Sequence, residues 1–206
     1  MSAPPFRGWP KEALAWFAGL EANNSREWFH ANRTTYDEAV RQPLESLLAE
    51  VEAEFGEGKV FRPNRDTRFS KDKTPYKTNV AALVGSHYVE LTREGLFVGG
   101  GVYHPERERL ARIRAGIDDG RAGPELASIV AGLRAEGLEL LTDGALKTAP
   151  KGYAADHPRI ELLRQVNLAA GRRFAPAAWL HTAKAKDRII GAWRALDPLV
   201  RWVEAR

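Results

Sequence analysis

Residues 88–103, YVELTREGLFVGGGVY, carry the clearest strand signal in the chain. Tyr88 to Leu91 and Leu96 to Tyr103 are rich in aromatic and β-branched residues, and Thr92 to Gly95 between them is typical of a short polar turn. The stretch therefore predicts a β-hairpin near the middle of the sequence.

Helical patterns lie on both sides of this hairpin. Apolar residues recur at helical spacing from Trp9 to Leu20, and again from Ser25, the expected N-cap, to Phe55. Pro43 is expected to kink this second run or to begin a new helix. Later helices are predicted to begin at Pro105, Pro124 and Pro158, and a final one is predicted to bury Ile189, Trp193, Leu196, Val200 and Val203. Central, mainly antiparallel strands flanked by N-terminal and C-terminal helices predict the α+β class.

Length and composition limit the remaining choices. The chain has 206 residues, of which 44% are hydrophobic and 28% are charged, so we predict a single globular domain over residues 1–206. The absence of cysteine excludes disulfides, thiolate nucleophiles and cysteine metal sites. No stretch approaches the roughly 20 apolar residues of a membrane span, and the first residues contain no signal-peptide run. We therefore expect a cytoplasmic location and no membrane partner.

Positive charge is concentrated in residues 59–79, KVFRPNRDTRFSKDKTPYKTN, which we call the basic segment. It contains seven lysines and arginines against two acids, Asp66 and Asp72, which gives a net charge of +5. The whole chain carries only +4, so the positive field is local. A local field of this kind is expected at a site that collects an anion.

The first half of the basic segment, Val60 to Ser70, is predicted to be extended. If it is a strand, Asp66 and Arg68 share a face about 6.6 Å apart and can converge on one ligand atom, whereas Arg65 is not expected to reach it. One face would then carry Arg62, Asn64, Asp66, Arg68 and Ser70, and the other Phe61, Pro63, Arg65, Thr67 and Phe69. Lys71 to Pro75 is predicted to be a turn, and Tyr76 to Val84 a returning strand.

Several motifs in the chain have an unusual composition. They are RDTRFSKDKTPYKT at 65–78, NSREWF at 24–29, FVGGGVY at 97–103, PKGY at 150–153 and DHP at 156–158. Together they resemble the pattern of a conserved hypothetical protein family, domain of unknown function 2461, and the resemblance runs through most of the chain. It implies no particular reaction, because no activity is established for that family.

The basic segment has the parts of an oxyanion or phosphate cradle. Guanidinium groups bind phosphate in bidentate fashion, lysines add point charge, and hydroxyl groups donate hydrogen bonds. The predicted ligand is therefore small and anionic, with phosphate as the favoured group. The predicted ligand-binding residues in this segment are Arg65, Asp66, Arg68, Ser70, Lys71, Lys73, Tyr76 and Lys77. Lys151 and Tyr153 belong to a second basic loop that resembles the family pattern, and this loop either closes over the cradle or lies on the surface.

Asp66 and Tyr76 are the candidates for chemistry. Asp66 could act as a general base or metal ligand, but an acid among arginines more often orients them, which we favour. The Tyr76 phenol could be activated by nearby lysines, but a half-buried aromatic residue that anchors the turn is the simpler interpretation. In the purely structural alternative, Arg68 pairs with Asp66 and Lys73 with Asp72. Whether the protein is an enzyme stays open.

The five histidines are scattered, so no metal site is predicted, and the sequence identifies no cofactor. The run Gly99 to Gly101 does not fit the dinucleotide-binding pattern. In a strand it leaves a trough between Phe97 and Tyr103, which another backbone or a ligand could fill equally well.

Two other functions stay open, and the sequence does not indicate the oligomeric state. A nucleic-acid-binding module is supported by the local charge and by Phe69 and Tyr76, which could stack on bases. A scaffold would dock the basic segment on an acidic partner, or on the protein's own residues 10–58, which carry ten acids and four bases.

Overall fold

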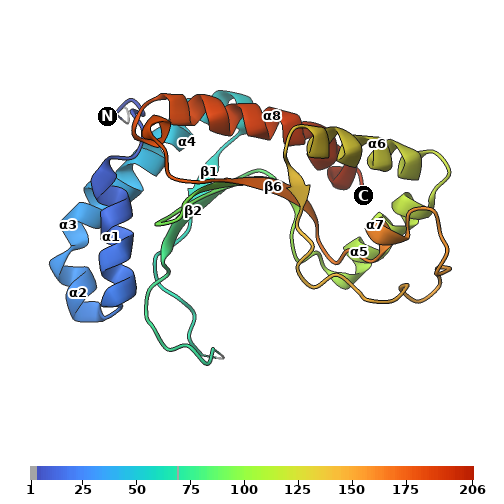
Figure 1. Cartoon of the computed structure of the whole chain (residues 1–206), viewed down its shortest axis with the longest axis horizontal. Helices are drawn as coiled ribbons and strands as arrows, with labels where there is room; N and C mark the ends of the chain where they lie inside the picture. Colours follow the sequence, from blue (N-terminus) through green and yellow to red (C-terminus); the bar gives the residue numbers. More distant parts are fainter. Residues whose placement is uncertain (1–3, 69) are drawn as a thin grey trace. The chain divides into compact units, whose positions relative to one another are not determined.

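The computed structural model describes residues 4–68 and 70–206, and it divides into two compact units. Unit 1 consists of Met1–Val98 and Arg173–Gly191, and unit 2 consists of Gly99–Arg172 and Ala192–Arg206. Figure 1 traces the course of the chain through both. Within the described residues, no helix combines the length and the apolar character needed to cross a membrane.

The helices expected on both sides of the central hairpin are present, and the structure adds short elements that the sequence does not predict. Unit 1 contains α1 (Lys11–Ala22), α2 (Arg26–Ala31), α3 (Arg33–Thr35), the π-helix η1 (Tyr36–Arg41), α4 (Gln42–Phe55), β1 (Gly58–Val60), β2 (Asn79–Val84), β3 (His87–Thr92) and the 3-10 helix η2 (Ala178–His181). Unit 2 contains α5 (Arg107–Asp118), α6 (Ala122–Ala135), β5 (Glu139–Leu140) and α7 (Ile160–Leu163). Three elements pass from one unit into the other, namely β4 (Gly95–Val102), β6 (Leu168–Phe174) and α8 (Lys184–Glu204).

The strands form one sheet in the order β1-β2-β3-β4-β6-β5. Antiparallel pairing joins β1 to β2, β2 to β3 and β5 to β6. The predicted hairpin is confirmed as β3 and β4, and helices lie at both ends of the chain. The structure therefore confirms the α+β class, while the assignment of all 206 residues to a single domain stays a prediction.

Local sequence signals explain where the helices of unit 1 begin. The Ser25 hydroxyl accepts a hydrogen bond from the Trp28 amide at 3.1 Å, as expected of an N-cap. Pro43 lies in the first turn of α4, which confirms a new helix there. Trp9, which lies outside the preceding π-helix η1, stabilises it: the Trp9 indole donates a hydrogen bond to the Val40 carbonyl oxygen at 3.2 Å.

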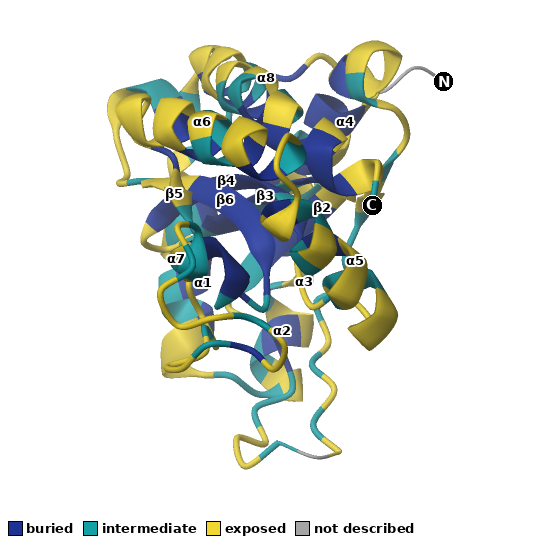
Figure 2. Ribbon diagram, turned by 90° about the vertical axis from the view of Figure 1, so that its right-hand side faces the viewer, coloured by how far each residue is buried: buried dark blue, intermediate teal, exposed yellow. Residues whose placement is uncertain are grey.

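The two faces of β2 and β3 differ sharply in burial. One face supplies core residues, namely Val80, Ala82, Val84, Val89 and Leu91. The register pairs Asn79 with Thr92, Ala81 with Glu90 and Leu83 with Tyr88, so these six side chains share the other face. Of them, only Ala81 is fully buried, and we call this the open face. Figure 2 shows the contrast between buried and exposed residues.

Gly101 explains part of the glycine run in β4. Its φ is +118°, a conformation that side chains disfavour, and an added Cβ would clash with the carbonyl oxygen of Leu168. The backbone of β6 therefore occupies the space that Gly101 leaves. This strand was absent from the sequence prediction.

We predict that Gly101→Ala lowers the free energy of unfolding by about 2 kcal/mol or more, because the substitution combines backbone strain with a clash. Gly132→Ala is the matched control, since Gly132 lies in α6 with no atom near the added Cβ. This control should gain roughly 0.5–1 kcal/mol from helix propensity. Chemical denaturation measures both changes, and a neutral Gly101→Ala would contradict the close approach of β6.

Candidate functional site

The basic segment forms two extended arms that run antiparallel to each other. Asn64 and Tyr76 form an isolated bridge, the Arg65 amide donates to the Pro75 carbonyl at 2.9 Å, and the Lys77 amide donates to the Pro63 carbonyl at 2.8 Å. In Figure 1 the segment projects as a long loop from strands β1 and β2. Regular strand structure ends at Val60 and resumes only at Asn79, later than the predicted start at Tyr76. The prolines in both arms lack the amides that a regular ladder needs.

The predicted alternation of side chains along the first arm is nevertheless present. Arg62, Asn64, Asp66 and Arg68 are exposed, whereas Phe61, Pro63, Arg65 and Thr67 are partly buried. This period of two is that of an extended chain with one face against the protein. Phe69 lies outside the described residues, and Ser70 beyond it is partly buried.

Asp66 binds Arg68 in bidentate fashion. The Arg68 Nε lies 3.0 Å from Asp66 Oδ1, the Nη2 lies 2.7 Å from Oδ2, and the Arg68 amide donates to Oδ1 at 3.2 Å. These donors hold the pKa of Asp66 below its usual value, so the carboxyl group is ionised at neutral pH. The contacts are those expected of an acid that orients an arginine, and the Arg68–Asp66 pair is also the one that the purely structural alternative predicts.

Asp72 holds the second arginine in a tight turn. Its Oδ1 accepts the Thr74 amide at 2.9 Å, its Oδ2 pairs with Arg65 Nη1, and the same Nη1 donates to the Thr74 hydroxyl at 2.8 Å. The hydrogen bonds from Thr74, followed by the one from Arg65, lower the pKa of Asp72 to about 2. Lys73 does not take the expected partner Asp72 but donates to the Thr67 carbonyl at 2.9 Å.

Both carboxylates of the basic segment are thus used to position arginines. Five of the seven cations remain, and within the described residues none of the five has a carboxylate partner: Lys59, Arg62, Lys71, Lys73 and Lys77. Lys77 is the most enclosed of them, and its pKa is lowered by burial and by the charge of Arg62. Its ammonium lies 5.5 Å from the centroid of the Phe61 ring. The positive field predicted from the sequence therefore persists in the folded segment.

Tyr76 fastens the segment to the helices. Its ring stacks on Phe29 of α2 with centroids 3.9 Å apart and planes inclined by 11°, and only 5% of the residue is exposed. The Asn24 side chain donates to the Tyr76 carbonyl at 3.0 Å and accepts the Tyr76 amide at 3.1 Å. The motifs at 24–29 and 65–78 therefore meet in space, and Tyr76 acts as an anchor.

This anchor is continuous with the aromatic core of unit 1. The Trp16 ring lies edge-on to Phe29 at 5.6 Å and 5.0 Å from Tyr36, and its indole donates to the Asn32 carbonyl at 3.1 Å. Burial raises the pKa of Tyr36 to about 12, so this phenol stays protonated. The basic segment is thus attached, through Tyr76, to a cluster of packed aromatic rings.

Lys151 and Tyr153 belong to unit 2, whereas the basic segment belongs to unit 1. Lys151 is exposed, and Tyr153 is partly buried with its amide bonded to the Pro150 carbonyl at 3.2 Å. Their loop is held by His157, which accepts the Arg159 amide at 3.0 Å and contacts Asp118 at 3.1 Å. A role for Lys151 and Tyr153 in ligand binding stays a prediction.

Sequence reasoning missed the residues that hold the segment in place. Asn24 and Phe29 lie about fifty positions before Tyr76, and their only signal was the unusual NSREWF motif. Thr74 lies within the turn predicted at Lys71 to Pro75, but its hydrogen bonds with Arg65 and Asp72 were not predicted. In the part of the chain that the structure describes, no three His, Asp or Glu side chains gather closely enough to hold a metal ion.

The comparison with protein families agrees with these motifs. The model of the family described as "Conserved hypothetical protein (DUF2461)" matches residues 12–202, so the chain belongs to this family. No curated protein matches the sequence.

We expect Tyr76→Ala to lower the free energy of unfolding by about 3 kcal/mol, because it removes a buried ring from the stack on Phe29. Tyr76→Phe is the control, since it keeps the ring and removes only the phenol. This control should change stability by no more than about 0.5 kcal/mol and should retain ligand binding. If Tyr76→Phe abolished binding while preserving stability, the phenol would have a chemical role and the anchor account would fail.

Proposed function

We propose that the protein binds a small anionic ligand carrying phosphate through its basic segment. The observation that carries this proposal is the set of five cations that have no carboxylate partner among the described residues, beside two arginines already fixed by acids. Arg65, Arg68, Lys71, Lys73 and Lys77 would supply charge, with the Ser70 and Thr74 hydroxyl groups as further donors. Asp66 would act as the orienter of Arg68, and Tyr76 as the anchor. The proposed site of action is the cytoplasm.

The electrostatics of the free segment support an anionic partner. Two ion pairs lie within the segment, and five more positive charges stand within the same 21 residues. Their mutual repulsion is visible at Lys77, where the charge of Arg62 adds to burial in lowering the pKa. A bound phosphate would relieve that repulsion, because an opposite charge favours the ionised lysine.

The scaffold alternative, in which the segment docks on the acid-rich helices, receives less support. Glu21, Asp37, Glu45 and Glu50 of residues 10–58 pair with other cations, which are Arg93, Arg33, Arg41 and Lys186. The contacts that join the basic segment to residues 24–29 are the ring stack of Tyr76 on Phe29 and two hydrogen bonds between the Asn24 side chain and the Tyr76 backbone. These contacts leave the charges of the segment for another partner.

A thermal-shift panel of nucleotides, sugar phosphates, phospholipid head groups, polyphosphate and short oligonucleotides tests the proposal. A ligand at 100 times its dissociation constant stabilises the protein by ~2.7 kcal/mol, which corresponds to roughly 5 to 11 °C for a chain of this size. The shift should be lost in a variant that combines Arg62→Gln, Lys71→Gln and Lys73→Gln, because all three cations are exposed on the segment.

The matched control combines Arg7→Gln, Lys11→Gln and Lys184→Gln, which removes the same charge from exposed positions outside the segment. This control should keep the full shift. Equal losses in the two triple variants would show that binding follows net charge alone, and the proposal would be wrong. The absence of any shift across the panel would also contradict it.

A further inference from the structure

Three aromatic side chains form a row across the open face of unit 1. The ring centroids of Phe61 and Tyr88 are 6.4 Å apart, and those of Tyr88 and Phe97 are 6.1 Å apart. A cation lies at each end, since Lys77 Nζ is 5.5 Å from the Phe61 ring and the Arg173 guanidinium is 5.3 Å from the Phe97 ring. All three rings are partly exposed. We call these three aromatic residues the ring row.

The sheet explains why these rings gather on one side. The Phe61 amide donates to the Ala81 carbonyl, which continues the β1–β2 pairing and places Phe61 beside Ala81 and Glu90. Phe97 lies between Leu96 and Val98, both fully buried, so it points to the face opposite the core. The ring row therefore occupies the face that the core does not use.

Glu90 fixes the centre of this face. Its Oε2 accepts hydrogen bonds from the Tyr88 hydroxyl at 2.8 Å and from Asn79 Nδ2 at 2.7 Å, and its Oε1 lies 3.7 Å from Arg173. Only 15% of the Glu90 side chain is exposed. These hydrogen bonds hold the Tyr88 ring in a defined orientation. A surface that made only nonspecific apolar contacts would not need a ring fixed in this way.

The charges on this face indicate the kind of ligand that it can accept. Lys59, Lys77 and Arg173 border the ring row, and Glu90 is the acid whose contacts with this face the described structure shows. A cationic ligand is disfavoured, because Lys77 and Arg173 already take the cation positions at two rings and would repel it. An anionic ligand with flat rings fits both features, since its rings can stack while its charges meet the flanking cations.

We propose that the open face binds single-stranded nucleic acid, with bases stacked on Phe61, Tyr88 and Phe97 and phosphates held by Arg173, by Lys77 and by other cations of the basic segment. Several rings in a row on an open sheet, bordered by cations, favour a strand with successive bases over a single ring. This inference rests on the proposed function, because the basic segment supplies part of the phosphate contacts. It adds Phe61, Tyr88, Phe97 and Arg173 to the ligand-binding residues that the sequence analysis predicts.

Fluorescence anisotropy with a labelled single strand of about 12 nucleotides tests the inference. Phe61→Leu and Phe97→Leu should each weaken binding about fivefold or more while leaving the salt dependence unchanged, because stacking is lost and phosphate contacts remain. Lys77→Gln and Arg173→Gln should instead reduce the log-log salt slope by about 0.7 for each phosphate contact removed. A duplex of the same sequence should compete poorly, because its bases are already stacked.

Trp179→Leu is the matched control, since Trp179 is a partly exposed aromatic residue with Arg188 at 4.8 Å that does not belong to the ring row. It should bind the strand like the unmodified protein. Unfolding midpoints would verify that all variants fold. If neither Phe61→Leu nor Phe97→Leu weakens binding, or if the duplex competes equally, the inference is overturned.

The result also separates this inference from the proposed function. Binding of polyphosphate or mononucleotides that depends on Arg62, Lys71 and Lys73, without binding of the single strand, would overturn the inference and keep the phosphate site. Single-strand binding that depends on the ring row but is unaffected by the triple variant would overturn the phosphate site. In that case Lys77 and Arg173 would supply the phosphate contacts alone.

Discussion

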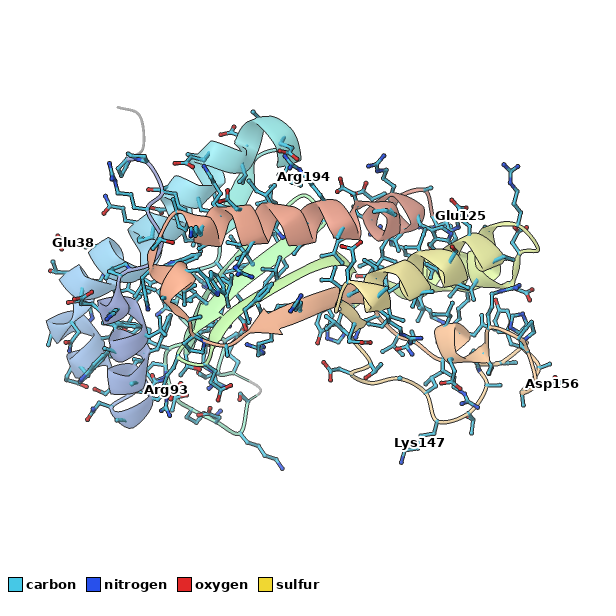
Figure 3. The ribbon with its side chains drawn as sticks, turned by 45° about the horizontal axis from the view of Figure 1, so that its top comes forward. Glu38, Arg93, Glu125, Lys147, Asp156 and Arg194 are labelled. Atoms are coloured by element: carbon cyan, nitrogen blue, oxygen red, sulfur yellow. The ribbon has the colours of Figure 1, made fainter. Side chains whose placement is uncertain are left out.

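The position of the basic segment depends on the stack of Tyr76 on Phe29, which is supported by two hydrogen bonds between the Asn24 side chain and the Tyr76 backbone. It joins a helix near the start of the chain to an irregular loop that has little regular structure of its own. Two prolines prevent a continuous ladder in that loop, so its arms rely on a few backbone hydrogen bonds and on this anchor. A charged loop can thus keep a defined shape, because its fixed point lies in the aromatic core. Figure 3 shows the charged side chains that surround the ribbon.

The charged residues of the basic segment fall into two groups, those in ion pairs and those without a carboxylate partner. Asp66 and Asp72 each hold one arginine, and the remaining cations face the solvent or the open face without a carboxylate partner in the described structure. Lys77 connects the two surfaces, since it belongs to the segment and also lies near the Phe61 ring. The basic segment and the ring row are therefore neighbours in unit 1, and one ligand could contact both.

Much of the fold was predictable because its signals are local. Ser25 caps a helix, Pro43 begins one, and the polar turn at residues 92–95 joins two strands, as their short-range chemistry indicates. Strand β6, with the sequence LAAGRRF, was missed because alanine, glycine and arginine are weak strand formers and its partners supply the pairing. In the basic segment, the sequence located the cations, and the contacts of Asp66 with Arg68 and of Tyr76 with Phe29 are those expected of an orienting acid and an anchor, while their roles toward a ligand stay predictions. It could not identify Asn24, Phe29 or Glu90, because their partners are distant in sequence or set by strand register.

Amide hydrogen exchange at Arg65 and Lys77 is the most direct test of the account, because both amides bond across the arms of the basic segment. We predict that both amides are protected in the free protein and that added polyphosphate slows their exchange further. Asn24→Ala should reduce the protection in the free protein, since it removes the clamp on Tyr76. If the Arg65 and Lys77 amides of the free protein exchanged as fast as those of an unstructured chain, the claim that the segment is anchored would be wrong. Unchanged exchange in the presence of polyphosphate that stabilises the protein would place the phosphate site elsewhere.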